Sequence, residues 1–111
     1  MVKSAALDRT FSALSDSTRR GILERLQLGP ASITDLAKRA GISLPGVLKH
    51  VRVLEEARLV TTAKNGRTRE CRLGPDSMDD ATRWIEMQRA ALERRLDRLE
   101  AVLERRKGER T

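Results

Sequence analysis

The stretch SITDLAKRAGISLPGVLKHVRVLEEARL, residues 32–59, decides the fold of this chain. It begins with an apolar stripe at helical spacing, which predicts a helix of about two turns. The stripe consists of Ile33, Leu36, Ala37 and Ala40. Gly41 follows, and we expect it to end the helix because glycine adopts a positive φ without steric cost. The stretch therefore opens with a short helix and a tight turn.

A second, longer helix is expected to begin at about Leu44. Ser43 can cap it, and Pro45 fits its first turn, where the missing N–H costs little. Apolar residues at i, i+4 and i+7 then predict a buried face, made of Val47, Val51 and Leu54. The exposed start is small, polar and basic, which suits a helix that enters the major groove of DNA. The expected DNA-binding residues on this helix are Ser43, Leu44, Pro45, Gly46, Lys49, His50 and Arg52.

These residues differ in the contacts expected of them. Lys49 and His50 are expected near base edges or phosphates. His50 is the only histidine, and a neutral polar contact is favoured over the alternatives of a metal ligand or a pH switch. Gly46 would let the helix approach the DNA closely, and Leu44 or Pro45 would pack on a thymine methyl group.

The net charge of +7 is unevenly distributed along the 111 residues. Residues 1–43 carry seven basic and four acidic side chains, residues 44–73 carry seven and three, and residues 74–111 carry nine of each. A fixed positive field attracts polyphosphate, so double-stranded DNA is the first partner to test. Charge alone does not decide whether the protein binds DNA, because basic proteins that bind no DNA also exist.

The length of the chain predicts a single domain with a modest core.

The cysteine content and the hydropathy of the chain restrict its possible disulfides, metal sites and cellular location. Cys71 is the only cysteine, so we expect no intrachain disulfide and no local cysteine-based metal site. No cofactor is expected either. The sequence allows two roles for Cys71. It is either a small apolar residue buried on a strand or a redox-active thiol whose pKa is lowered by Arg69 and Arg72. No apolar run approaches the length that spans a bilayer, and the N-terminus lacks a hydrophobic signal core. We expect a cytoplasmic protein with no membrane partner.

Two helices are expected before the central stretch. The first covers residues 5–14 and has an apolar face of Leu7, Phe11 and Leu14. The second covers residues 18–28, with Asp16 as its cap. The basic pair Arg19-Arg20 near its start could touch phosphate or could pair internally with Asp16 or Glu24.

A β-hairpin is expected after the central stretch. Residues 59–64 are rich in β-formers, Asn65-Gly66 is a strong hairpin signal, and residues 67–73 return with alternating polarity. Lys64, Arg67 and Arg69 cluster at or near its tip. Such a basic finger can follow the DNA backbone or enter a minor groove, and the alternative is an ordinary solvated loop.

A final helix is expected over about residues 77–106, after Gly74-Pro75-Asp76 breaks the strand and caps the helix. Five apolar residues repeat there at the 3.5-residue period of a coiled-coil seam. They are Ile85, Leu92, Leu96, Leu99 and Leu103. We expect this seam to pair with a second copy, helped by Leu7, Phe11 and Trp84. The alternative is an intramolecular seam with a free, mixed-charge end.

The order of these elements resembles the winged helix-turn-helix of the ArsR/SmtB family of bacterial repressors. The matching stretches are LDRTFSALSDSTRRGILERL (7–26), ITDLAKRAGISLPGVLKHVRVLEEARLV (33–60) and NGRTRECRL (65–73). The resemblance implies a mainly α fold with a small β-hairpin wing. Residues 1–74 would form the winged helix-turn-helix with an N-terminal dimerisation helix, and residues 75–111 a C-terminal dimerisation helix and charged tail of the same domain.

The resemblance also implies a function. It implies a homodimer that binds a short inverted repeat and represses transcription until a signal, such as an unidentified small-molecule effector, releases it. The chain departs from the metal-sensing members, because residues 35–39 (DLAKR) lack their Cys-x-Cys motif and the terminal helix has no histidine. The family pattern also usually has Gly where this chain has Arg58, so the turn into the wing is expected to differ.

Other classes of protein fit the sequence less well. An enzyme is not expected, because no nucleophile with a base, no paired carboxylates and no phosphate-binding glycine loop are visible. RNA binding by base stacking is not favoured, because Phe11 and Trp84 are the only aromatic residues and both lie in apolar stripes. The main alternative is a protein-interaction or adaptor module that uses the C-terminal coiled-coil helix and has an incidental basic surface.

Overall fold

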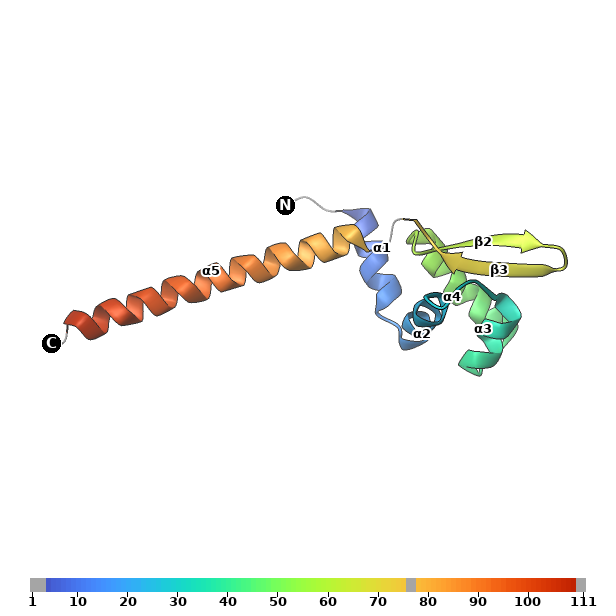
Figure 1. The fold of residues 1–111 in the computed structure, drawn as a ribbon, viewed down its shortest axis with the longest axis horizontal. Helices are drawn as coiled ribbons and strands as arrows, with labels where there is room; N and C mark the ends of the chain where they lie inside the picture. Colours follow the sequence, from blue (N-terminus) through green and yellow to red (C-terminus); the bar gives the residue numbers. More distant parts are fainter. Residues whose placement is uncertain (1–3, 76–77, 110–111) are drawn as a thin grey trace. The chain divides into compact units, whose positions relative to one another are not determined.

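Five helices and a small sheet make up the computed structural model, which describes residues 4–75 and 78–109 (Figure 1). The elements are α1 (Ala5–Leu14), α2 (Ser17–Leu26), β1 (Ala31–Ser32), α3 (Ile33–Ala40), α4 (Leu44–Glu56), β2 (Val60–Asn65), β3 (Thr68–Leu73) and α5 (Asp79–Glu109). The chain divides into an N-terminal unit, residues 1–79, and a C-terminal unit, residues 80–111. This confirms the expected mainly α fold with a hairpin wing and a long C-terminal helix.

Two of the helices in the N-terminal unit begin at the caps that the sequence predicts. Asp16 accepts a hydrogen bond from the Arg19 N–H at 3.0 Å, and Ser43 accepts one from the Gly46 N–H at 3.2 Å. Gly41 ends α3 with a φ of 67°, in the left-handed region that glycine adopts freely. The central helix-turn-helix is therefore specified by local chemistry at both of its turns.

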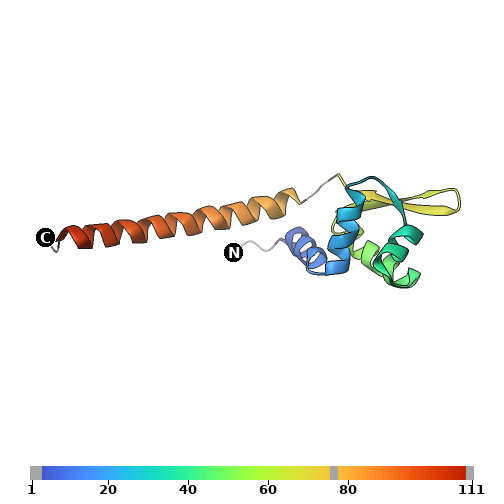
Figure 2. The same ribbon diagram turned by 60° about the horizontal axis from the view of Figure 1, so that its bottom comes forward.

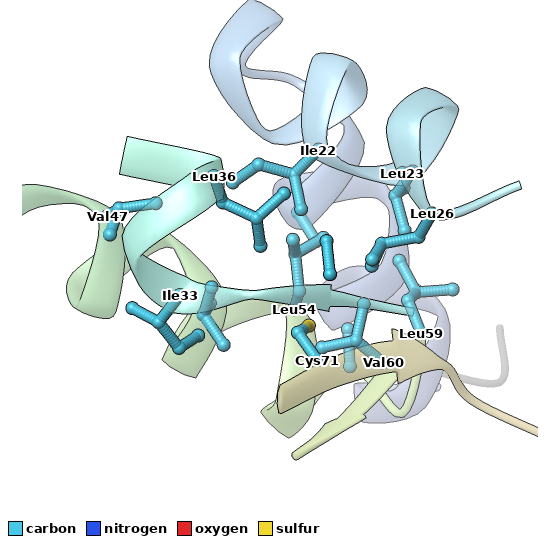
Figure 3. Close-up of a cluster of buried hydrophobic side chains, with 14 of the residues drawn as sticks. Ile22, Leu23, Leu26, Ile33, Leu36, Val47, Leu54, Leu59, Val60 and Cys71 are labelled. Atoms are coloured by element: carbon cyan, nitrogen blue, oxygen red, sulfur yellow. The ribbon is translucent and has the colours of Figure 1, made fainter. Parts of the chain in front are cut away.

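The core of the N-terminal unit lies between α2, α3, α4 and the sheet (Figure 3). The α4 side chains in it are Val47, Val51 and Leu54, each at most 2% exposed, as their spacing predicts. The other large members are Ile22, Leu23, Leu26, Ile33, Leu36, Leu59, Val60 and Cys71. Fully burying one such aliphatic side chain stabilises the fold by about 1.5–3 kcal/mol. This packing fixes the inner face of α4 and leaves its outer face free for function.

The sheet has three strands in the order β1-β3-β2, one more than expected. The additional strand, β1, is only two residues long and pairs antiparallel with β3, with Ala31 opposite Cys71. Sequence periodicity could not predict it, because two residues show no alternation. The hairpin itself is confirmed: β2 and β3 pair antiparallel, and the ladder ends with Asn65 opposite Thr68.

The two-residue loop of the hairpin consists of Gly66 and Arg67, one position later than the expected Asn65-Gly66 turn. Gly66 has a φ of 66°, and neither Asn65 nor Arg67 has a positive φ. A positive φ at the first loop residue alone is characteristic of a type II′ turn, which prefers glycine there. The turn projects beyond the helices of the N-terminal unit in both views (Figures 1 and 2).

The turn from α4 into β2 contains a strained residue. Arg58 has a φ of 62°, a left-handed conformation that costs a residue with a side chain roughly 1 kcal/mol or more. Arginine thus adopts a left-handed conformation that glycine reaches without steric cost. Gly74 lies beside this turn: its N–H donates to the Leu59 carbonyl at 2.8 Å, and a Cβ on it would lie 2.5 Å from the Arg58 carbonyl oxygen.

The C-terminal unit consists almost entirely of α5, which runs for 31 residues and exposes its apolar seam. The seam residues Ile85, Leu92, Leu96, Leu99 and Leu103 are each 49–57% exposed. Other described residues of its own unit thus do not cover the seam, and its pairing with a second copy or with the rest of the chain stays a prediction. The expected cap at Asp76 and start at Ser77 lie outside the described residues, and the helix ends at Glu109 rather than Arg106. Within the described ranges, no helix is long and apolar enough to cross a membrane.

Candidate nucleic-acid interface

The outer face of α4 is open to solvent along its first turns. Because Val47, Val51 and Leu54 turn one face into the core, the residues between them must face outward. The exposed residues on this face are Ser43, Leu44, Pro45, Leu48, Lys49 and Arg52. The structure therefore brings together on one surface five of the seven residues of this helix that the sequence assigns to DNA.

Gly46 is half-buried against the cap of α4. A Cβ on Gly46 would lie 3.1 Å from Ser43 Oγ and 3.7 Å from Ile42 Cδ1, so a side chain there would crowd the cap. The Ser43 oxygen already accepts the Gly46 N–H, but its own O–H remains available as a donor. Glycine thus preserves the cap and leaves the Ser43 hydroxyl free to donate to a ligand.

His50 contacts the protein as well as solvent, which the sequence did not indicate. Its ring is half-buried, with Nδ1 3.2 Å from Arg19 Nη1 and 3.8 Å from Asp16 Oδ2. The pKa of Asp16 lies below its usual value, chiefly because the carboxylate accepts the Arg19 N–H, and electrostatic interactions with His50 and Arg19 lower it further. An ionised N-cap and an arginine therefore face the histidine of α4.

Arg19 and Arg20 both donate hydrogen bonds to other residues of the protein. Arg19 donates from Nε to the Ala13 carbonyl at 2.8 Å and from Nη2 to the Ser12 carbonyl at 2.9 Å. Arg20 donates to the Leu14 carbonyl at 2.7 Å. Both arginines therefore make internal contacts, with main-chain carbonyls at the end of α1 as the hydrogen-bond acceptors, and the charge of Arg19 also acts on the expected partner Asp16.

Three basic side chains lie at the hairpin tip, as expected. Lys64 and Arg69 are directly opposite each other in the ladder, Arg67 lies in the loop, and all three are exposed. Like charges on directly opposed residues destabilise a sheet, so this tip favours a bound anion. Arg69 donates to Thr62 Oγ1 at 3.2 Å, and Thr62 donates to Glu55 Oε2 at 3.0 Å. A chain of hydrogen bonds therefore links the hairpin to α4.

Cys71 is a core residue and not a reactive thiol. It is 0% exposed, and burial raises its pKa to about 11, with the negative charge of Glu55 adding to the effect. A thiol with a raised pKa is a poor nucleophile at neutral pH. The expected small apolar role is confirmed, and the alternative in which Arg69 and Arg72 lower the pKa is wrong. Within residues 4–75 and 78–109, no three His, Cys, Asp or Glu side chains form a group that could hold a metal ion.

The residues expected at a dimer interface are only partly buried within the chain. On α1, Leu7 and Phe11 are half-buried. On α5, Trp84 is 46% exposed, beside the exposed seam. Each of these two helices therefore keeps apolar surface in contact with solvent.

The sequence analysis missed two features of the outer side of α4. Leu48 is 38% exposed one helical turn after Leu44, which is 47% exposed, so the outer face of α4 carries an apolar pair. Its position between the buried Val47 and Val51 could have revealed it. The other is the contact between Arg19 and His50, which lie 31 positions apart and give no signal in sequence spacing.

Comparisons with known proteins agree with this geometry. A model of a helix-turn-helix domain matches residues 14–63. The HTH-type transcriptional regulator Rv2034 of Mycobacterium tuberculosis is 42% identical over 71 residues, which cover 64% of this chain and 66% of that protein. The transcriptional repressor SdpR of Bacillus subtilis is 29% identical over 79 residues, which cover 71% of this chain and 88% of that protein.

Solved structures extend the similarity to almost the whole chain. An ArsR-like transcriptional regulator from Rhodococcus sp. RHA1 has a TM-score of 0.80 and 33% identity, covering 90% of this chain and 92% of that one. The homodimeric winged helix-turn-helix DNA-binding domain of a possible ArsR-family regulator from Mycobacterium bovis shares the fold, with a TM-score of 0.61, 21% identity and coverage of 83% and 82%. On the strength of the matched helix-turn-helix, the curated regulators and the Rhodococcus structure, this chain belongs to the ArsR family of winged helix-turn-helix transcriptional regulators.

Proposed function

We propose that this regulator is a homodimeric repressor that binds an inverted-repeat operator in double-stranded DNA. The observation that carries the proposal is the outer face of α4, which is polar, basic and exposed while the inner face is fixed in the core. The repressor SdpR supports the direction of regulation, and the homodimeric Mycobacterium bovis domain supports the assembly at the level of the fold.

The first turns of α4 would enter the major groove. Ser43 would donate its hydroxyl to a phosphate oxygen, and Lys49 would contact a base edge or a phosphate. The exposed pair Leu44 and Leu48 suits contact with thymine methyl groups. Arg52, further along the helix, would contact a phosphate. Contacts of these side chains with phosphates would position the protein on the DNA, and their contacts with base edges would read the sequence.

The hairpin tip would supply charge more than sequence readout. Lys64 and Arg69 repel each other in the free protein, and a phosphate or a narrow minor groove placed against them would relieve that repulsion. Arg67 would extend the contact from the loop. Each phosphate neutralised in this way steepens the salt dependence of binding.

A second copy would cover the seam of α5. Leu92, Leu96 and Leu99 follow the 3.5-residue period and are more than half exposed, and burying one leucine fully contributes about 1.5–3 kcal/mol. The flanks of the seam carry opposite charges, Arg95 on one side and Glu100 on the other, which can pair across two helices. A two-fold dimer would then present two copies of α4 to half-sites about one helical turn apart.

Selection from random double-stranded DNA with the purified full-length protein tests the proposal. We expect enrichment of an inverted repeat whose half-site centres lie about 10 base pairs apart. The Lys49→Gln variant, taken through the same selection, assigns the contact: a uniform loss of affinity indicates a phosphate, and a loss confined to the enriched sequence indicates a base edge. Failure to enrich any sequence, or enrichment of single half-sites, would contradict the proposal.

Repression is tested separately. The enriched repeat is placed between a constitutive promoter and a reporter gene, with a scrambled repeat as the matched control. We expect co-expression of the protein to lower reporter output only with the intact repeat. Increased output would indicate an activator instead.

A further inference from the structure

We propose that Arg19 is a positioning residue that fixes His50 on α4 as a hydrogen-bond donor toward DNA. The inference rests on the proposed DNA-binding function and adds to it a residue that lies on α2 and not on the groove-facing helix. It also states which kind of group His50 recognises, namely a hydrogen-bond acceptor.

The guanidinium of Arg19 is held in place by main-chain atoms. Nε donates to the Ala13 carbonyl at 2.8 Å and Nη2 donates to the Ser12 carbonyl at 2.9 Å. The third nitrogen, Nη1, lies 3.2 Å from Nδ1 of His50. Because the guanidinium is planar and two of its nitrogens are tied to carbonyls, the direction of the third N–H is fixed as well.

The chemistry of the pair determines the histidine tautomer. An arginine side chain has donors and no acceptor, so Nδ1 of His50 must be the acceptor and carries no proton. In the neutral ring the proton then lies on Nε2. Nε2 has no partner among the residues that the structure describes, and the His50 side chain is 26% exposed. Nε2 therefore remains as an N–H donor for an external group.

Asp16 makes the other tautomer of His50 possible. Its Oδ2 lies 3.8 Å from Nδ1 of His50, so a small movement would let it accept a hydrogen bond from a protonated Nδ1. Without the Arg19 side chain, Nδ1–H would face Asp16, and Nε2 would become an acceptor. Arg19 thus decides whether α4 offers a donor or an acceptor at His50. A donor matches phosphate oxygens and the acceptor atoms of guanine, thymine and adenine (its N7), but not the amino groups of cytosine and adenine.

The tautomer can be measured in the free protein. His50 is the only histidine, so its ring nitrogens give unambiguous signals in ¹⁵N spectra recorded above the usual titration range of histidine. We expect the proton on Nε2 in the wild type and in the control Arg20→Gln, and a shift of the proton toward Nδ1 in Arg19→Gln. A wild-type proton on Nδ1, or no difference between Arg19→Gln and the wild type, would overturn the proposal.

Binding to the selected operator provides the second readout. His50→Gln keeps a distal N–H donor, whereas His50→Asn lacks it, so we expect near wild-type affinity for the first and a loss of about fivefold to tenfold for the second. Arg19→Gln should show a similar loss with an unchanged salt slope, and combining it with His50→Asn should add little. Additive losses, or a shallower salt slope, would instead make Arg19 a phosphate contact and contradict the proposal.

The two measurements separate the inference from the function on which it rests. If the wild-type protein binds no DNA, the proposed function fails, while the ¹⁵N spectra still decide whether Arg19 sets the tautomer. If DNA binds and the spectra show no effect of Arg19, only the positioning role fails.

Discussion

Gly74 and Gly21 illustrate how the surroundings of a residue decide the effect of adding a single methyl group. A Cβ on Gly74 would lie 2.5 Å from a carbonyl oxygen of the turn into the wing, whereas a Cβ on Gly21, within α2, would meet nothing within 4 Å. We expect Gly74→Ala to lower the free energy of unfolding by about 1–3 kcal/mol, because backbone must move. Gly21→Ala should raise it by roughly 0.5–1 kcal/mol through helix propensity. Urea unfolding of both variants checks this pair, and equal effects would contradict it.

Cys71 couples stability to alkaline pH. Its pKa rises from 9.0 to about 11 in the folded state, so the stabilisation is complete below about pH 9 and is lost as the pH rises through about 11. Two pKa units correspond to about 3 kcal/mol, and we expect a fall of that order in the free energy of unfolding. Urea titrations across this range measure it. Cys71→Ala should be less stable at neutral pH but should lack this component of the decline, and an identical decline in both proteins would refute the assignment.

At the level of elements, the hairpin tip should show opposite effects on stability and binding. Replacing Lys64 by Gln removes the repulsion with Arg69, so the free protein should gain up to about 1 kcal/mol. The same change should weaken DNA binding and make the salt dependence shallower, because a phosphate contact is lost. Unfolding curves and affinities at several salt concentrations test both effects.

A control substitution on the same hairpin separates the effect of the tip position from the effect of removing any basic charge. Arg72 lies nearer the base of β3 and pairs with Glu70 at 2.6 Å. We expect Arg72→Gln to leave the salt slope unchanged. An equal change of slope in both variants would mean that net charge, not the position of the tip, governs binding.

At the level of the whole molecule, the seam of α5 should determine the oligomeric state. Leu96→Glu places a charge in the seam and should shift the protein toward monomer, whereas Ala101→Glu places the same charge on the opposite side of the helix and should leave the dimer intact. Sedimentation equilibrium checks this. A monomeric wild type, or dissociation by both substitutions, would contradict pairing through the seam, and operator affinity should fall together with dimer content.

Much of the fold follows from the sequence because its signals are local. The caps Asp16 and Ser43, the terminating Gly41, the buried face of α4 and the two long strands are set by short-range chemistry and periodicity. These signals fail where an element is too short to show a period, or where one more residue pair in a ladder shifts the position of a turn. The two-residue β1 has no period, and the turn at Gly66 begins one position late because the ladder extends to Asn65.

The sequence by itself determined the helix-turn-helix, the basic wing, the apolar seam and the resemblance to the ArsR family, since each is written in neighbouring residues. Only the tertiary structure decided what distant residues do to one another. It placed Arg19 against His50, buried Cys71 with a raised pKa, and put Arg58 in a left-handed turn beside Gly74. The physical reason is that burial and hydrogen-bond partners depend on which parts of the chain meet in space, and these contacts join residues with no regular spacing along it.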